Sequence, residues 1–220
     1  TPGISGLTAE KMSLYAEAIS RNSAITNTTS TVYIDDGASH YKISTGDKIS
    51  IAINGTAYEF RVLGFNHDTL TSSTAYGSAT ATGKAGMTLQ MVNCLAATAK
   101  MNSSNTNSGG WESCAMRTSN MATYLSQLTS AWQSVVKQVN KLSSAGSQST
   151  TIKTTADKLF LLSEVEIFGS TTYSVSGEGT QYAYCKANNT ASDRVKTVNG
   201  SASSWWERLF LYTSDAADEE

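Results

Sequence analysis

The chain has few residues suited to covalent or metal chemistry. Its three cysteines, Cys94, Cys114 and Cys185, are odd in number and widely spaced, which predicts unpaired thiols rather than a disulfide framework or a zinc ribbon. Apolar runs are short as well. None approaches the roughly 18 residues that span a bilayer, and no charged segment precedes an apolar one as in a signal peptide. We therefore expect no membrane partner and no cofactor.

Charge is scarce and nearly balanced. Lys and Arg total 16 against 18 for Asp and Glu, without a basic cluster, which argues against a nucleic-acid partner. Serine and threonine, in contrast, make up more than a quarter of the 220 residues, while charged residues make up 15%. This balance is more typical of extracellular or virion proteins rich in β structure than of cytosolic enzymes. We therefore expect a location on a virion or at a cell surface.

The length allows one domain with a small appendage. Residues 1–30 are expected to form the appendage, because Thr8–Arg21 has apolar residues at helical spacing and Asn22–Ser30 is a polar linker. This helix is also a candidate contact for a homo-oligomer. Residues 31–210 are assigned to the main domain and residues 211–220 to a tail.

A hairpin is the clearest local prediction. Apolar and polar residues alternate on both sides of Asn54-Gly55, and both central positions of a type I′ turn need positive φ. The pattern therefore predicts two antiparallel strands over Ile49–Phe65.

The three residues after this hairpin, Asn66, His67 and Asp68, could in principle ligate a metal. A run of three neighbours lacks the spacing of metal ligands, however. A capped turn in which a neighbour satisfies His67 is the favoured interpretation.

The segment Asp157–Gly169 holds the most continuous apolar run, which predicts a buried strand that ends at Gly169. In a strand, Glu164 and Glu166 would lie on the same face. They could form the acid/base pair of a glycoside hydrolase. A structural role is favoured for them and for Glu178, because carboxylates inside apolar segments persist only when paired or hydrogen-bonded.

The flanking segments have weaker patterns. Four predictions follow from them: a helix over Met121–Leu128, a Ser/Thr-rich loop over Ser143–Thr155, an aromatic strand at Gln181–Tyr184 and a polar, turn-rich stretch at Lys186–Ser204.

The motif GGWESCAMR, at Gly109–Arg117, contains a tryptophan that can anchor a core and an arginine that can clamp a carboxylate. That carboxylate could belong to a ligand. An internal partner for Arg117 is favoured, and the candidates are Glu112, Glu164 and Glu178.

Several separated motifs resemble, in the same order, an uncharacterised domain family of gut bacteria and their phages, domain of unknown function 6273. They are GGW-x-S-x-x-x-R at Gly109–Arg117, DKLFLLSEVEIFG at Asp157–Gly169, GEGTQYAY at Gly177–Tyr184 and WW-x-R at Trp205–Arg208. The hairpin text at Asn54–Asp68 also resembles phage members. The resemblance covers roughly Tyr41–Arg208, and the family has no assigned catalytic residues to transfer.

The family pattern is in turn similar to the C-type-lectin-like fold of formylglycine-generating enzymes and hypervariable phage receptor-binding proteins. The resemblance therefore implies an α+β, C-type-lectin-like mixed domain: a twisted antiparallel sheet with two or three short helices. In the family, the WW motif is followed by L-R-S-P and further strands, whereas this chain departs after Arg208. Leu211–Glu219 looks like translated sequencing adapter, so we expect an incomplete domain.

The expected function is recognition without catalysis, on a phage tail or a bacterial surface protein, with a carbohydrate or protein receptor as the partner. No catalytic residue and no metal ligand is assigned. The alternatives are a glycoside hydrolase that uses Glu164 and Glu166, and a purely structural virion role; formylglycine-type oxidation lacks a recognisable cysteine motif. The candidate ligand-binding residues are Trp111, Arg117, Glu178, Tyr182, Trp205, Trp206 and Arg208.

Overall fold

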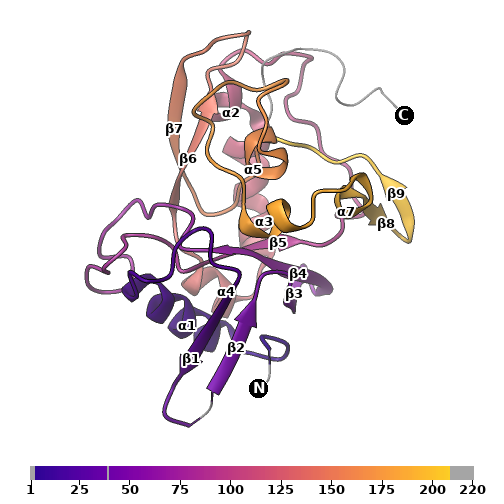
Figure 1. Ribbon diagram of the computed structural model, residues 1–220. Coiled ribbons are helices and arrows are strands. Elements are labelled where there is room, and N and C mark those ends of the chain that lie inside the picture. The colour runs from indigo at the N-terminus through magenta and orange to yellow at the C-terminus, as the bar shows by residue number, and fades with distance from the viewer. Residues whose placement is uncertain (1–2, 39, 209–220) are drawn as a thin grey trace. The chain divides into compact units, whose positions relative to one another are not determined.

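The computed structural model describes residues 3–38 and 40–208, and its chain divides into two compact units (Figure 1). Unit 1 consists of Thr1–Val92, Ser126–Asn140 and Tyr182–Ala187. Unit 2 consists of Asn93–Leu125, Lys141–Gln181 and Asn188–Glu220. The predicted tail, residues 211–220, and with it the adapter-like segment Leu211–Glu219, lies outside the described residues.

Unit 1 begins with the predicted helix, α1 (Ala9–Arg21). The Thr8 side chain accepts a hydrogen bond from the Lys11 backbone N–H at 3.2 Å, which caps the helix as expected. Its apolar residues, among them Met12, Tyr15 and Ile19, are buried, and the helix contacts β1 and α4 of the same unit. The prediction that this helix mediates a homo-oligomer stays a prediction.

The predicted hairpin of unit 1 is confirmed. Strands β3 (Lys48–Ile53) and β4 (Thr56–Phe65) pair antiparallel and turn at Asn54 and Gly55, whose φ angles are 48° and 78°. Strand β5 (Met87–Met91) adds to the other edge of β4 and completes a three-stranded sheet.

The other elements of unit 1 are a second hairpin and two short helices. The hairpin joins β1 (Thr31–Asp35) to β2 (His40–Ser44), and the helices are α4 (Ser130–Val135) and α6 (Ala183–Ala187). The aromatic strand predicted at Gln181–Tyr184 is wrong. The Lys186 N–H donates to the Tyr182 carbonyl at 2.9 Å, and alanines favour this helical turn.

Unit 2 contains short helices and two small two-stranded sheets, β6–β7 and β8–β9. The helices are α2 (Gly110–Ser113), a π-helical turn (Met116–Asn120), α5 (Glu164–Phe168) and α7 (Ala191–Arg194). Helix α3 (Met121–Gln127), which confirms the predicted one, and strand β6 (Val139–Ser144) cross the boundary between the units. The remaining strands are β7 (Ile152–Asp157), β8 (Lys196–Val198) and β9 (Ser201–Ser203).

The loop predicted over Ser143–Thr155 is correct only in its middle, because strands β6 and β7 occupy its two ends and residues 145–151 connect them. Its Ser/Thr content suggested a loop, yet β-branched threonines also favour strands. The turn needs Gly146, whose φ is 76° and whose position leaves no room for a side chain: a Cβ atom would lie 1.8 Å from the Asn107 carbonyl oxygen.

The strand predicted over Asp157–Gly169 is also wrong. Helix α5 occupies its second half, and Ser163 and Glu166 form a reciprocal capping box at the helix start. The Ser163 Oγ accepts from the Glu166 N–H at 3.3 Å, and the Glu166 carboxylate accepts from the Ser163 N–H at 3.0 Å. Gly169 ends the helix with a φ of 71°. The local capping chemistry therefore prevails over the apolar pattern.

Trp111 is fully buried in the core of unit 2, where it clusters with Met101, Cys114 and Met116. Phe160 packs against this cluster and is partly buried, as is Val165 in helix α5. Leu162 and Ile167 are buried, as the apolar run predicts. Tyr182 is also buried and belongs to unit 1.

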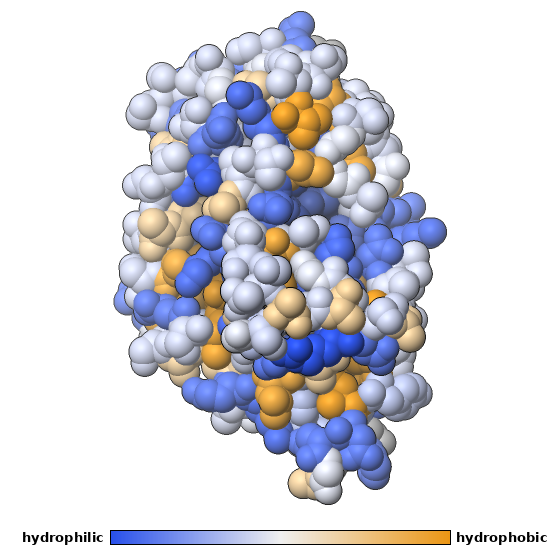
Figure 2. All heavy atoms as spheres, turned by 90° about the vertical axis from the view of Figure 1, so that its left-hand side faces the viewer, coloured by the Kyte–Doolittle hydropathy of each residue, from blue (hydrophilic) through white to orange (hydrophobic). Residues whose placement is uncertain are grey.

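The described residues form a mixed α+β fold with several small antiparallel sheets and short helices. None of the three cysteines forms a disulfide bond, as predicted, and Cys114 and Cys185 are buried. On the face that Figure 2 shows, hydrophobic residues form separate patches between hydrophilic ones. Among the described residues, no helix combines the length and apolar character needed to cross a membrane.

Candidate functional site

A groove of about 380 Å³ opens to solvent beside the β8–β9 hairpin of unit 2. The hairpin turns at Asn199-Gly200, with φ angles of 51° and 83°. Backbone and side-chain groups of residues 93 and 94 hold β8 through hydrogen bonds to Thr197. The groove is lined by Val195, Lys196, Ala202, Ser203, Ser204 and Trp205. Among the described residues, the lining thus combines an indole, two hydroxyls and one cation, with no carboxylate.

The two neighbouring tryptophans are held by their indole N–H groups. Trp205 Nε1 donates to the Arg194 carbonyl at 3.2 Å, and Trp206 Nε1 donates to the Ala99 carbonyl at 2.8 Å. The Lys196 ammonium lies 5.1 Å from the centroid of the Trp205 ring, within the range of a cation–π contact. Trp206 is 39% exposed, and Trp205 is half-buried at the groove. Both rings therefore have fixed edges, and their remaining surface is open to contact.

Arg208 ends the segment that carries the tryptophans and is fully buried. Its backbone N–H donates to the Leu162 carbonyl at 2.6 Å, and its guanidinium donates to the carbonyls of Leu161 and, at 3.0 Å, Leu142. The same guanidinium pairs with the Glu166 carboxylate at 3.2 Å. We call Ser204–Arg208 the strap, because both of its ends are attached to folded structure.

Glu166 links the strap to strand β6. One carboxylate oxygen accepts from the Lys141 ammonium at 2.5 Å, and the other faces Arg208 and the Ser163 N–H. The Lys141 ammonium also lies 4.1 Å from the centre of the Phe160 ring. Lys141, Glu166 and Arg208, which we call the anchor cluster, are each at most 2% exposed. A buried cluster of this kind is tolerated because each charge has a counter-charge and hydrogen bonds.

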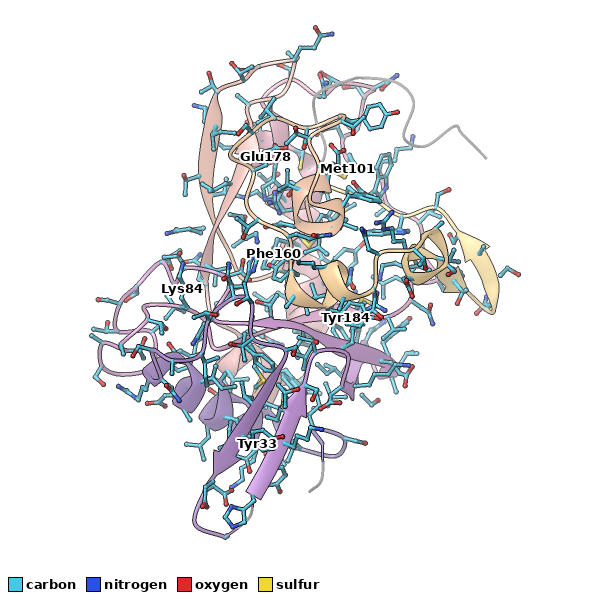
Figure 3. All side chains as sticks on the ribbon, in the orientation of Figure 1. Tyr33, Lys84, Met101, Phe160, Glu178 and Tyr184 are labelled. Carbon is cyan, nitrogen blue, oxygen red and sulfur yellow. The ribbon has the colours of Figure 1, made fainter. Side chains whose placement is uncertain are left out.

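The other two carboxylates of the predicted set hold loops, as expected. Glu164 accepts from the Ser170 hydroxyl and from the N–H groups of Thr172 and Tyr173, at 2.8 to 3.1 Å. Glu178, marked in Figure 3, accepts from the N–H groups of Ser144 and Val175. Burial raises the pKa of Glu178 against the lowering effect of these hydrogen bonds.

Trp111 and Arg117 share a partner that the sequence did not indicate. The Asp157 carboxylate accepts from Trp111 Nε1 at 2.9 Å and from Arg117 Nε at 2.7 Å. The favoured internal partner is thus an aspartate, and the predicted pairing of Arg117 with Glu112, Glu164 or Glu178 is wrong. The sequence did not indicate this pair because Asp157, at the end of β7, is forty residues away from Arg117 along the chain.

Tyr182 belongs to unit 1, whereas the other candidate ligand-binding residues belong to unit 2. Its hydroxyl donates to Asp68 at 2.8 Å, and its ring stacks on His67 with centroids 3.8 Å apart. The His67 ring thus packs against a neighbour of its own unit, and the predicted capped turn stays a prediction. Among the seven candidate residues, Trp205 lines the groove and Trp206 follows it in the chain, whereas Trp111, Glu178 and Arg208 are buried with internal partners.

Residues 85–218 match the model of a family described as a domain of unknown function (DUF6273). The match covers more than half of the chain. The chain belongs to this family. No curated protein and no solved structure matches the chain. The match includes the anchor cluster, the strap and the groove, and it begins after the Asn54–Asp68 hairpin text that also resembled the family.

The DUF6273 match contains two features of this site that the sequence reasoning missed. Lys141 was missed because no local pattern pairs it with Glu166, twenty-five residues later. Strands β8 and β9 lie in the stretch predicted to be turn-rich, Lys186–Ser204. There a signal was present: Asn199-Gly200 is the same turn dipeptide that identified the first hairpin.

Glu207 lies within the strap, and its shifted pKa makes the stability of this DUF6273 chain depend on pH. Burial, and then the charge of Glu164, raise its pKa from 4.5 to about 7, against the opposing charge of Arg194. The folded state therefore keeps this proton between about pH 4.5 and 7, where the unfolded chain has released it. Stability gained from the proton is present at low pH and is lost as the pH rises through this window.

We expect the Glu207→Gln variant to lack this loss. Relative to the variant, the wild type should lose on the order of 2 kcal/mol of unfolding free energy between about pH 4.5 and pH 7.5. Urea titrations at several pH values measure this difference, and Glu59→Gln, an exposed glutamate of unit 1, is the control. If the free energy of unfolding changes with pH in the same way for wild type and Glu207→Gln, the pKa of Glu207 is not raised and the prediction is wrong.

Proposed function

We propose that the chain is a non-enzymatic recognition module that binds a carbohydrate at the groove beside the strap. The observation that carries the proposal is a polar groove lined by Trp205, which is followed in the chain by the exposed indole of Trp206. Indole faces stack against the C–H faces of sugar rings, while hydroxyl and ammonium groups bond to sugar hydroxyls. Lys196, Ser203 and Ser204 supply these polar groups in the lining.

The buried carboxylates support recognition rather than hydrolysis. A glycosidase needs two carboxyl groups that face a cleft with room for the sugar between them. Glu166 is 2% exposed and is paired with Lys141, and Glu164 is 5% exposed and holds a loop. On helix α5 the two side chains are separated by one residue and take different partners. This geometry favours their structural role.

The setting of the module is proposed from the family resemblance. The resemblance to phage proteins and the serine- and threonine-rich composition support a place on a phage tail or a bacterial surface protein. The similarity of the family pattern to C-type-lectin-like proteins supports the same fold for this chain. The sequence also suggested a protein receptor as the partner. The binding test below distinguishes it from a carbohydrate, because a protein receptor predicts that no glycan binds.

We expect the purified chain to bind particular members of an array of bacterial surface glycans, and Trp206→Ala to lower that binding about tenfold or more, because a lost aromatic stack costs about 1.5 kcal/mol. The matched control is Tyr33→Ala, because Tyr33 is 76% exposed on β1 of unit 1 (Figure 3). Equal losses in the two variants, or no glycan bound by a folded chain, would exclude the groove as a sugar site.

A further inference from the structure

We propose that Arg208 is a positioning residue, which sets the orientation of Trp205 and Trp206 at the groove through its buried contact with Glu166. The inference rests on the proposed function, since the groove is what the strap shapes. It gives the anchor cluster a second role besides stabilising the fold, namely the placement of the strap.

The strap depends on side-chain contacts for its placement. Strand β9 ends at Ser203, and Arg208 follows five residues later, with no helix or strand in between. Within the strap, the two indole N–H groups each make one hydrogen bond, to Arg194 and Ala99. Ordering the backbone of five residues costs conformational entropy, and two single hydrogen bonds do not offset that cost. A stronger attachment is therefore needed to hold both rings in one arrangement.

Arg208 provides that attachment with defined geometry. Its planar guanidinium donates to two backbone carbonyls, those of Leu142 and Leu161, and pairs with Glu166. Its own N–H donates to the Leu162 carbonyl. A guanidinium presents its donors in a rigid fork, so contacts in several directions fix its plane as well as its position. The chain two and three residues before it, which carries Trp205 and Trp206, is fixed with it.

The composition of the cluster supports orientation as its role. Apolar side chains of similar volume often stabilise a core as well as a buried ion pair does, so stability is a weak reason for an ionic cluster. Lys141 holds one oxygen of the Glu166 carboxylate, and the Ser163 N–H bonds to the other oxygen, which also faces Arg208. Glu166 is thereby a fixed docking point for the end of the strap.

The test uses fluorine NMR of the full chain labelled with fluorotryptophan, without any sugar. The chain has four tryptophans, Trp111, Trp132, Trp205 and Trp206, and single Trp→Phe variants assign their signals. In Arg208→Met we expect the Trp205 and Trp206 signals to move toward the position of the free amino acid. The Trp111 and Trp132 signals should stay in place. Arg208→Lys, which keeps the charge and loses the fork, should give a smaller displacement of the same two signals.

The matched control is Arg117→Met, which removes another arginine that is paired with a buried carboxylate of unit 2. It should move the Trp111 signal, because both side chains share Asp157, and leave the strap signals unchanged. The proposal is overturned if Trp205 and Trp206 keep their signals in Arg208→Met. It is also overturned if all four signals move together in Arg208→Lys, since Arg208 then supports the whole fold. Because the NMR experiment contains no sugar, its outcome does not depend on whether the glycan array shows binding. A failed NMR test likewise leaves the proposed sugar binding untouched.

Discussion

Glu166→Gln is expected to lower the free energy of unfolding by about 3 to 5 kcal/mol, the largest loss that we predict for a change of a single functional group. The substitution removes a charge that faces Lys141 on one side and Arg208 on the other. Both cations are at most 2% exposed, so neither can recover its hydration without local unfolding. Urea titration of wild type and variant at neutral pH measures the difference.

The control for this experiment is Glu112→Gln, the same chemical change at a surface position. Glu112 has a side-chain exposure of 45% and lies 3.9 Å from Lys153, so its loss should cost less than about 1 kcal/mol. A double variant that also carries Lys141→Met should lose less than the sum of the single variants, because it leaves fewer unpaired charges. If Glu166→Gln is as stable as Glu112→Gln, the cluster does not exist as described.

Trp111→Ala should also unfold the chain at much lower denaturant concentration, with a loss of about 3 to 5 kcal/mol. The ring is fully buried against Met101, Cys114 and Met116, and its removal leaves a cavity. It also takes away the N–H that the Asp157 carboxylate accepts at 2.9 Å. Trp111→Phe should recover most of the packing and retain a loss of about 1 to 3 kcal/mol from the unsatisfied carboxylate.

Trp206→Ala is the matched control, since it deletes the same side chain at a 39% exposed position. We expect it to cost less than half as much as Trp111→Ala, as read from denaturant midpoints at an unchanged slope. Equal losses in the two variants would mean that the strap belongs to the core of unit 2, which would remove Trp206 as a recognition surface.

Some of the fold could be predicted because its signals are local. Helix α1 follows from a cap and a helical period, and the β3–β4 hairpin follows from alternation around Asn54-Gly55. In both cases the residues that decide the structure are neighbours in the sequence. The mixed α+β class was implied by the family resemblance, and these two elements agree with it.

The segment Asp157–Gly169 shows why other predictions failed. Its apolar run outweighed two local signals, the capping box from Ser163 to Glu166 and the glycine that ends α5. Weighing those signals would have predicted the helix. The partners of Glu166 could not be predicted in this way, because Lys141 and Arg208 approach from distant parts of the chain.

The sequence predicted some of the residues of the candidate site, but it did not predict which residues lie together there. Trp205 and Trp206 belong to a conspicuous motif, and the sequence indicated them as binding residues. Lys196 lies in a polar segment without any pattern, so its place beside Trp205 emerges only from the structure. Arg208 was predicted to contact a ligand, whereas the structure places it in the interior.

The most direct measurement for the recognition groove is a nitrogen NMR titration that follows the four tryptophan indole N–H signals while the strongest glycan from the array is added. A sugar that stacks at the groove should move the Trp205 and Trp206 signals in a saturable way. Trp111, buried in the core, and Trp132, in unit 1, should show no change. If the glycan saturates the chain while Trp205 and Trp206 stay in place, or if Trp132 alone responds, sugar binding lies elsewhere and the account of the groove is contradicted.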